Sequence, residues 1–409
     1  MVDGSIEPVV PDHPAVAAEA EEVLLAAGRL GAQLHPVTAQ AVAALLRTVN
    51  SYYSNLIEGH DTHPVEIERA MRHEYAAGSE ARNLQLEAAA HIEVQLLIEG
   101  RLAASPGTNV CAPDFICWIH REFYDRLPGA LRIVRNRDGS REVEIVPGAL
   151  RTYDVQVGTH VAPAHADLTH LLDRYARVYD PAGRSQREAL ILLGAAHHRL
   201  LWIHPFGDGN GRVARLITDA YLKRVGVGGH GLWTAARGLA RSGTRYREAL
   251  AAADAPRWND YDGRGALSHQ ALVAFARFFL EICLDQIGYM EGLLRVDRLA
   301  ERAESYGRAR EAGLLAGPEG TGAFRPEATR LLKQMIYRGA IPRGEVRELL
   351  NLEERTARRV VRALTDEGFV TSTTSRAPIT LRIPAHAGPY LMPGIYRTVG
   401  TVRTVGTVG

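Results

Sequence analysis

Residues His204 to Arg215 read HPFGDGNGRVAR, and this stretch decides how the middle of the chain folds. The residues before it, SQREALILLGAAHHRLLWI (185–203), and after it, RVARLITDAYLKRV (212–225), have the spacing of apolar helices. The stretch therefore predicts a turn between two helices. Gly209 and Gly211 permit positive φ and close backbone approach, so backbone N–H groups and the positive end of a helix dipole converge there.

The side chains of this turn predict an anion site with catalytic chemistry. Arg212 and Arg215 lie three residues apart at the start of the second helix, so they share a face and can both donate to a polyphosphate. Asp208 would repel phosphate unless Mg²⁺ lay between them, and Mg²⁺ commonly binds one or two carboxylates plus phosphate oxygens. His204 ends the first helix and is a candidate general base. We expect a hydroxyl to attack a nucleotide phosphate here.

The composition does not point to nucleic acid or a membrane as the main partner. The chain has 409 residues, with 48 Lys and Arg against 47 Asp and Glu, so it has no strong overall field. Cys111, Cys117 and Cys283 lack metal-type spacing, which favours buried thiols in a reducing compartment. The N-terminal residues do not resemble a signal peptide and no apolar run is long enough to span a bilayer, so we expect a soluble cytoplasmic protein.

Periodicity predicts a mainly α-helical fold. Apolar residues recur three and four apart over 37–59, where Gly59 is a C-cap, and helices are expected at about 82–103, 113–126, 165–179, 185–203, 212–224 and 266–297. Residues 141–163 alternate apolar and polar on either side of Pro147 and Gly148. We expect a hairpin there that brings Val143 and Ile145 beside Val155 and Val157.

The C-terminal part predicts a second, α+β domain. Charged residues followed by Gly and Pro predict a linker over 299–323, and the order helix, helix, helix, hairpin over 324–390 is typical of a winged helix-turn-helix. Its third helix has a basic face, for which DNA binding, protein docking and dimerisation stay open. Residues 391–409 are expected to form a disordered tail. The basic face comprises Arg355, Arg358, Arg359 and Arg362.

The motif and two further segments resemble the Fic family, whose signature is HxFx[DE]GNGRxxR. The residues SNLIEG (54–59) match the family's inhibitory motif [ST]xxxE[GN], and RTYDVQVGTHVAP (151–163) resembles its flap hairpin. The resemblance spans about 36–290 and implies a Fic-type helical core at 106–298, preceded by a helical region at 1–105 that carries an inhibitory helix. The signature is matched by His204, Phe206, Asp208, Gly209, Asn210, Gly211, Arg212 and Arg215.

The resemblance implies transfer of AMP from ATP to a Tyr, Thr or Ser hydroxyl of a target protein, or of the chain itself. By this analogy His204 deprotonates the hydroxyl and Asp208 holds Mg²⁺. Asn210 and the amides of Gly209 and Gly211 bind the phosphates, and Arg212 and Arg215 orient the β- and γ-phosphates. The target would pair as an added strand with the flap, at Val157, Gly158 and Thr159. Tyr246 occupies the position of an adenine contact, although Arg247 replaces the second tyrosine of that segment.

The resemblance also implies autoinhibition. Glu58 ends a helix, where its charge faces the negative end of the dipole, so a cationic partner is expected. In the family this partner is the last arginine of the signature, here Arg215, and Ser54 belongs to the same motif. Several alternatives stay open: removal of AMP, transfer of UMP, phosphate or phosphocholine, homodimerisation, and a DNA-binding regulator whose core only senses nucleotide. We expect structural roles for His160, His165, His170, His197 and His198, and a capping role for His60.

Overall fold

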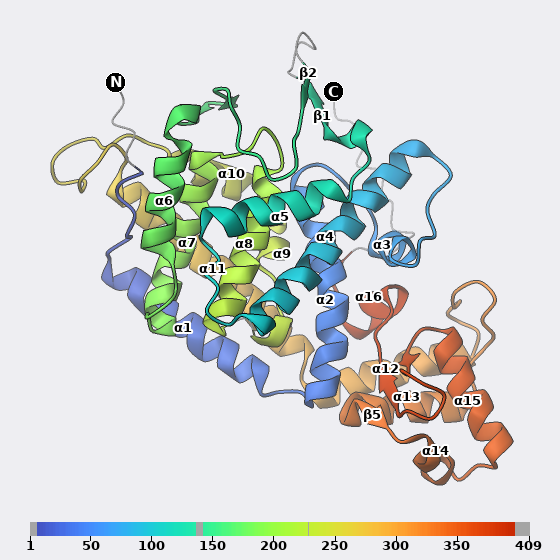
Figure 1. Cartoon of the computed structure of the whole chain (residues 1–409). Helices are drawn as coiled ribbons and strands as arrows, with labels where there is room; N and C mark the ends of the chain where they lie inside the picture. Colours follow the sequence, from blue (N-terminus) through green and yellow to red (C-terminus); the bar gives the residue numbers. More distant parts are fainter. Residues whose placement is uncertain (1–5, 136–141, 228, 397–409) are drawn as a thin grey trace, which may run out of the picture. The chain divides into compact units, whose positions relative to one another are not determined.

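The computed structural model describes residues 6–135, 142–227 and 229–396 (Figure 1). In this part of the chain the fold is mainly α-helical with short antiparallel strands, as the sequence predicts. The chain divides into two compact units. Unit 1 comprises Met1–Gly28, Asn50–Thr62 and Ala70–Gly288, and unit 2 comprises Arg29–Val49, His63–Arg69 and Tyr289–Gly409. Within the described ranges, we find no helix with the length and apolar character that a membrane span needs.

Among the described residues, unit 1 holds most of the helices and four short strands. α7 packs against α6 and α8, while α4 and α5 pack against α8 (Figure 1). α2 (Pro36–Ile57) contributes only its last residues to this unit. The other elements wholly or mostly in unit 1 are α1 (Pro14–Gly31), α4 (Ser79–Ala104), α5 (Pro113–Asp125), β1 (Ile133–Arg135), β2 (Glu142–Glu144), β3 (Gln156–Val157), β4 (His160–Val161), α6 (Leu168–Tyr179), α7 (Gln186–Ile203), α8 (Asn210–Val225), α9 (Ala235–Arg241), α10 (Gly243–Ala253) and α11 (His269–Leu293).

α7 forms the centre of unit 1. Its residues are buried on most sides, as expected of a helix that is apolar all round. The helix begins with a capping box: the Ser185 hydroxyl accepts a hydrogen bond from the Glu188 N–H (3.2 Å), and the Glu188 carboxylate accepts one from the Ser185 N–H (2.8 Å). The capping box and the buried side chains of α7 together fix the position of the His204 loop at the other end of the helix.

The strand pairing differs from the prediction. Val143 pairs with Val134 in β1–β2, and Val157 pairs with His160 in β3–β4, so the expected hairpin about Pro147 and Gly148 is wrong. The Gly148 N–H donates to His120 Nδ1 (2.8 Å), and a Cβ at position 148 would lie 3.1 Å from the Cys117 carbonyl oxygen. The Pro-Gly turn therefore lies against α5 and cannot reverse a hairpin.

The single helix expected over 266–297 is interrupted. α11 ends at Leu293 and α12 (Val296–Glu311) begins three residues later. The Arg302 guanidinium donates to the Leu293 carbonyl, which satisfies a terminal acceptor of α11, and Leu294 turns into the core. Residues 299–311, expected to begin a linker, are thus helical, with Leu299 and Ala303 buried.

Unit 2 contains the predicted C-terminal helices and hairpin together with one further strand. β7 pairs antiparallel with both β5 and β6, in the order β5–β7–β6, with Ala340 opposite Thr380 and Val370 opposite Leu381. Assignment of these elements to the winged-helix class stays a prediction. The elements are α3 (Pro64–Ala70, of which the last residue falls in unit 1), α12, α13 (Pro326–Arg338), β5 (Ala340–Ile341), α14 (Arg343–Leu350), α15 (Glu354–Asp366), β6 (Val370–Thr371), β7 (Ile379–Leu381) and α16 (Gly388–Leu391).

The expected tail does not begin at residue 391. Leu391, Met392 and Ile395 are fully buried. The rest of the predicted tail, 397–409, lies outside the described residues.

Candidate active site

The loop between α7 and α8 is closed by its own side chains. His204 adopts a left-handed conformation (φ 50°) as the C-cap of α7. Phe206 is fully buried and stacks on the His120 ring, with centroids 3.9 Å apart. The Asn210 side chain accepts from the Phe206 N–H (3.0 Å) and donates to its carbonyl (2.9 Å). The Asn210 amide side chain, predicted to bind phosphate, thus holds the loop in shape.

Gly209 is favoured by its backbone conformation, and Gly211 lies close to the Glu58 carboxylate. Gly209 has φ 77°, and a Cβ there would lie 2.8 Å from the Tyr124 ring. A Cβ at Gly211 would collide with Glu58 Oε1 and lie 3.1 Å from Arg215 Nη1. Within the described residues no side chain caps the N-terminus of α8, so its first backbone N–H groups can receive an anion.

Asp208 is an ionised carboxylate at the rim of this turn. Tyr124 donates to Asp208 Oδ2 (2.6 Å), and Arg212 Nη2 lies 3.5 Å from the same oxygen. Burial acts to raise the pKa of Asp208, but the charge of Arg212 and the Tyr124 hydrogen bond leave this pKa below its ordinary value. The side chain keeps 39% of its surface exposed, so it remains accessible.

The predicted Mg²⁺ fits this donor set. Within residues 6–135, 142–227 and 229–396, no three His, Cys, Asp or Glu side chains gather as a metal cage. Mg²⁺ at a nucleotide site is usually held by one or two carboxylates plus phosphate oxygens, and Asp208 supplies one accessible, ionised carboxylate. We therefore assign Asp208 as the residue that would hold the ion.

His204 has the properties of a neutral base. Its burial lowers the pKa to about 4, so the ring is uncharged at neutral pH. The Nδ1 atom lies 3.3 Å from the Leu201 carbonyl oxygen, which can only accept. The ring proton is therefore assigned to Nδ1, and Nε2 is left as the proton acceptor.

Arg151 was missed in the sequence, and it joins the base to the flap. Its side chain, fully buried, donates to the carbonyls of His204 (2.8 Å) and Tyr153 (2.9 Å), and also to that of Pro163 (2.5 Å). Its backbone N–H donates to the Pro205 carbonyl (3.0 Å). These carbonyls belong to the motif loop and to the segments just before β3 and just after β4. One guanidinium therefore fixes the motif loop and the β3–β4 hairpin relative to each other.

The predicted pairing of Glu58 with Arg215 is confirmed. Arg215 donates to Glu58 Oε1, to the Ser54 hydroxyl (2.8 Å) and to the Ser54 carbonyl (3.0 Å). Burial acts to raise the pKa of Glu58, but the charge and hydrogen bond of Arg215 lower it below its ordinary value. Glu58 and Ser54 therefore occupy donors of Arg215, the residue predicted to orient the β- and γ-phosphates.

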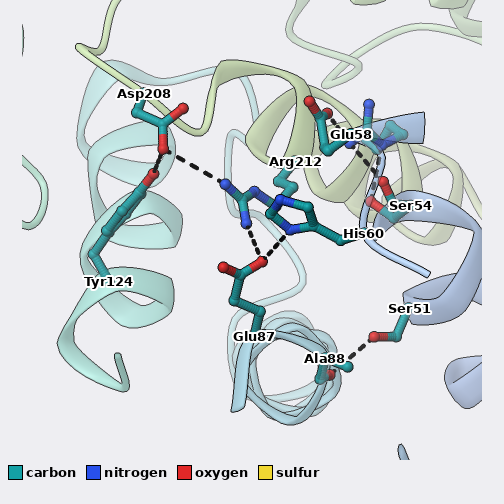
Figure 2. Close-up of polar contacts among 10 residues, drawn as sticks. Ser51, Ser54, Glu58, His60, Glu87, Ala88, Tyr124, Asp208 and Arg212 are labelled. Atoms are coloured by element: carbon teal, nitrogen blue, oxygen red, sulfur yellow. Dashed lines mark hydrogen bonds and ion pairs between the residues drawn. The ribbon is translucent and has the colours of Figure 1, made fainter. Parts of the chain in front are cut away.

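Arg212 is also bound by a carboxylate, which the sequence did not predict. Its Nη1 donates to Glu87 Oε2 of α4 (2.9 Å), and His60 Nδ1 lies 2.6 Å from the same oxygen (Figure 2). The Glu87 hydrogen bond raises the pKa of His60. His60 thus binds a carboxylate of the site and does not act only as a helix cap.

The predicted adenine contact is placed in the core of unit 1. Tyr246 is buried, and its hydroxyl lies 2.7 Å from His197 Nε2. His197 Nδ1 lies 2.8 Å from Thr218 Oγ1 of α8, so the expected structural role of His197 is met. Contact of Tyr246 with adenine stays a prediction.

The residues predicted to form the flap lie in the β3–β4 hairpin, and their role as a flap stays a prediction. Val157 ends β3 and is half exposed, and Gly158 (φ 61°) and Thr159 form the two-residue turn to β4. His160 of β4 lies 3.1 Å from Asp254 and 2.9 Å from the Trp202 carbonyl oxygen, which anchors the hairpin to α7 and α10. The hairpin therefore has one exposed side and one anchored side.

The missed residues differ in the signal they leave in the sequence. Glu87 interrupts the apolar run LQLEAAAHI, and a carboxylate on a buried helical face predicts a cationic partner. Tyr124 and Arg151 leave no such signal, because an aromatic residue in an amphipathic helix and one arginine among many are ordinary.

The middle of the chain matches a family model. Residues 110–222 match the model of the Fic/DOC family, and the match includes all of 204–215. It does not extend to Ser54 and Glu58, which come before its first residue.

Similarity to individual proteins is local in sequence and broad in fold. Over 79 residues the chain is 39% identical to a protein adenylyltransferase Fic of Drosophila ananassae and 38% identical to that of Drosophila melanogaster. This covers 19% of this chain and 16% of each relative, so the chain matches about a sixth of their length. A crystal structure of a Fic family protein from Desulfovibrio desulfuricans G20 aligns over 92% of this chain and 98% of that one, with TM-score 0.52 and 16% identity. At this identity the likeness establishes the fold.

Proposed function

We propose that the chain is an autoinhibited protein adenylyltransferase, which transfers AMP from ATP to a hydroxyl side chain of a protein. The observation that carries the proposal is the joint placement of His204, Asp208 and the uncapped α8 N-terminus in one loop, with Glu58 bound to Arg215 beside it. The family match and the named relatives support the same class of reaction.

The residues of the loop divide the reaction between them. The target hydroxyl gives its proton to His204 Nε2, and its oxygen forms a bond to the α-phosphorus of ATP. The bond between the α-phosphorus and the bridging oxygen breaks, and pyrophosphate leaves. The α8 N–H groups and Arg215 would hold the phosphates in line for this displacement. Mg²⁺, held by Asp208, would supply charge stabilisation of the phosphate oxygens.

The Glu58–Arg215 pair supports the inhibitory part of the proposal. While Arg215 donates to Glu58 and Ser54, its guanidinium is unavailable to a γ-phosphate. Its side chain is only 4% exposed, so water cannot replace these partners. Release of Glu58 would therefore be required before ATP binds productively.

Substitution of Glu58 tests this mechanism. We expect Glu58→Gly to raise incorporation of label from [α-³²P]ATP into protein by about tenfold or more, equivalent to about 1.4 kcal/mol in the activation barrier. Incorporation from [γ-³²P]ATP should stay absent, since the γ-phosphate leaves with pyrophosphate. The control is Glu58→Gly with His204→Ala, which should lose the incorporation. An unchanged or lower rate for Glu58→Gly would contradict autoinhibition.

Removal of AMP is a second candidate, favoured by one observation. Glu58 is ionised and 34% exposed beside the phosphate site, so it can position a water molecule. Protein labelled by Glu58→Gly would be incubated with the unsubstituted chain. Loss of the label with this chain, but not with Glu58→Gly, would make removal of AMP its net activity.

A further inference from the structure

Arg212 lies between two carboxylates, one on each side of its guanidinium group (Figure 2). Its Nη1 donates to Glu87 Oε2 at 2.9 Å, a hydrogen-bonded ion pair. Its Nη2 lies 3.5 Å from Asp208 Oδ2, within ion-pair range but beyond a good hydrogen bond. The arginine therefore binds Glu87 more closely than it binds Asp208.

We propose that Glu87 is a positioning residue, which holds Arg212 away from Asp208 and so keeps the Asp208 carboxylate available to Mg²⁺. The proposal rests on the proposed function, because it takes Asp208 as the metal ligand of an ATP site. It adds a residue on α4, outside the 110–222 family match, that sets how readily the site accepts the ion.

Arg212 and Glu87 are both buried, so a change in their pairing affects the neighbouring carboxylate. The side chains of Arg212 and Glu87 are 8% and 10% exposed. A buried guanidinium that loses its carboxylate seeks another, because water is not available to solvate it. Among the described residues, Asp208 is the carboxylate that already lies in ion-pair range of Arg212. Without the charge of Glu87, Arg212 would form a full pair with Asp208 and compete with Mg²⁺ for its oxygens.

The location of Glu87 favours positioning over inhibition. Glu58 follows the last residue of α2, where a change in the helix end can withdraw it. Glu87 instead lies within the 26-residue helix α4, followed by buried Ala88, Ala89 and Ala90. The Ser51 hydroxyl donates to the Ala88 carbonyl (2.9 Å), which ties this turn of α4 to α2 (Figure 2). Glu87 is thus a fixed acceptor that cannot leave when nucleotide enters.

His60 strengthens the same acceptor. Its Nδ1 lies 2.6 Å from Glu87 Oε2, the oxygen that also accepts from Arg212. Two donors on one oxygen restrict the rotation of the carboxylate. His60 lies two residues after Glu58, so the segment that carries Glu58 also helps to orient Glu87.

The test measures the Mg²⁺ requirement of ATP binding without chemistry. Isothermal titration calorimetry of ATP would be done with Glu58→Gly/His204→Ala at a series of Mg²⁺ concentrations. Adding Glu87→Gln should raise the Mg²⁺ concentration for half-maximal ATP affinity by about tenfold, as removal of outer-shell partners typically does. ATP affinity at saturating Mg²⁺ should change much less.

Two further variants serve as controls. Glu93→Gln removes a carboxylate of the same helix that binds Arg126 (2.7 Å), and it should leave the Mg²⁺ requirement unchanged. Glu87→Asp keeps the charge on a shorter side chain, so it should raise the Mg²⁺ concentration for half-maximal ATP affinity less than Glu87→Gln does. Glu87→Gln is informative only if it shows the thermal unfolding transition of the parent. If it does not, Glu87→Asp is compared with Glu93→Gln. We then expect Glu87→Asp to raise the Mg²⁺ concentration for half-maximal ATP affinity.

Several outcomes would overturn the proposal. An unchanged Mg²⁺ requirement in folded Glu87→Gln would do so, as would an equal loss of ATP affinity at every Mg²⁺ concentration. A rise in AMP transfer for Glu87→Gln alone, equal to that of Glu58→Gly, would show an inhibitory carboxylate in place of a positioning one. If the Glu58→Gly/His204→Ala parent binds no ATP at any Mg²⁺ concentration, the proposed function fails, and the inference fails with it.

Discussion

At the scale of single residues, the chemistry of His204 depends on what surrounds its ring. Burial lowers its pKa to about 4, and the nearby charges of His160 and Arg151 act in the same direction. An exposed histidine would have a pKa near 6.5 and would be partly protonated at neutral pH. The environment of His204 therefore keeps it in the basic form across the physiological range.

This pKa predicts the pH dependence of AMP transfer. A general base works when deprotonated, so activity is lost as the pH falls through its pKa. For Glu58→Gly we expect single-turnover rates that are flat between about pH 6 and 8, because both lie above a pKa of about 4. A rate that halves near pH 6.5 would show that the base titrates as an ordinary histidine.

At the scale of elements, the site is positioned by the two ends of α7. The capping box at Ser185 and Glu188 fixes the start of the helix, and His204 is its C-cap. The loop that follows is closed by the Asn210 side chain on the Phe206 backbone, and α8 begins at once. A helix with a fixed start and a buried body presents its last residue in a fixed orientation.

The capping box gives a stability prediction. Ser185→Ala removes the acceptor for the Glu188 N–H, and loss of such a cap costs about 1 kcal/mol. We expect this decrease in the free energy of unfolding, measured by urea denaturation. Ser185→Asp keeps a capping oxygen and should lose much less. Equal losses for the two variants would show that the cap does not carry the effect.

At the scale of the whole molecule, unit 2 is held by a buried ion pair. Arg310 of α12 donates through Nε and Nη2 to Glu367, which follows α15, at 2.7 and 2.8 Å. The Tyr306 hydroxyl donates to the same carboxylate (2.6 Å). Burial acts to raise the pKa of Glu367, but interactions with His386, Arg310 and Tyr306 lower it to about 2.

Removal of this carboxylate should destabilise unit 2. Glu367→Ala leaves a buried, uncompensated guanidinium, which costs about 3 kcal/mol in the free energy of unfolding. Because the folded pKa is depressed, the ionised group contributes stability above its unfolded pKa and loses it as the pH falls toward about 2. The difference between variant and parent, measured by urea denaturation, should therefore shrink below about pH 4.5.

The control is Glu319→Ala, which changes an exposed glutamate of the same unit. It should leave the free energy of unfolding nearly unchanged at every pH. A loss for Glu367→Ala that does not depend on pH would mean that its charge does not stabilise unit 2.

The sequence by itself determined the helical class and the turn at 204–215, whereas the pairing of Glu58 with Arg215 was a hypothesis taken from the family resemblance. Helical periodicity, caps and a short contiguous motif are local, so neighbouring residues alone specify them. The helices expected over 185–203 and 212–224 are α7 and α8, within a few residues at each end. The hairpin within 151–163 was expected only from the family resemblance, because the local pattern had placed the turn at Pro147 and Gly148 instead.

Only the tertiary structure decided which strands pair, where α11 ends and which side chains complete the site. Val143 pairs with Val134 because the Pro-Gly turn expected to reverse the chain lies against α5. Tyr124, Glu87 and Arg151 reach the site from separate segments. Such contacts join residues far apart in the chain. Their strength comes from the burial of both partners, and no local sequence pattern records that burial.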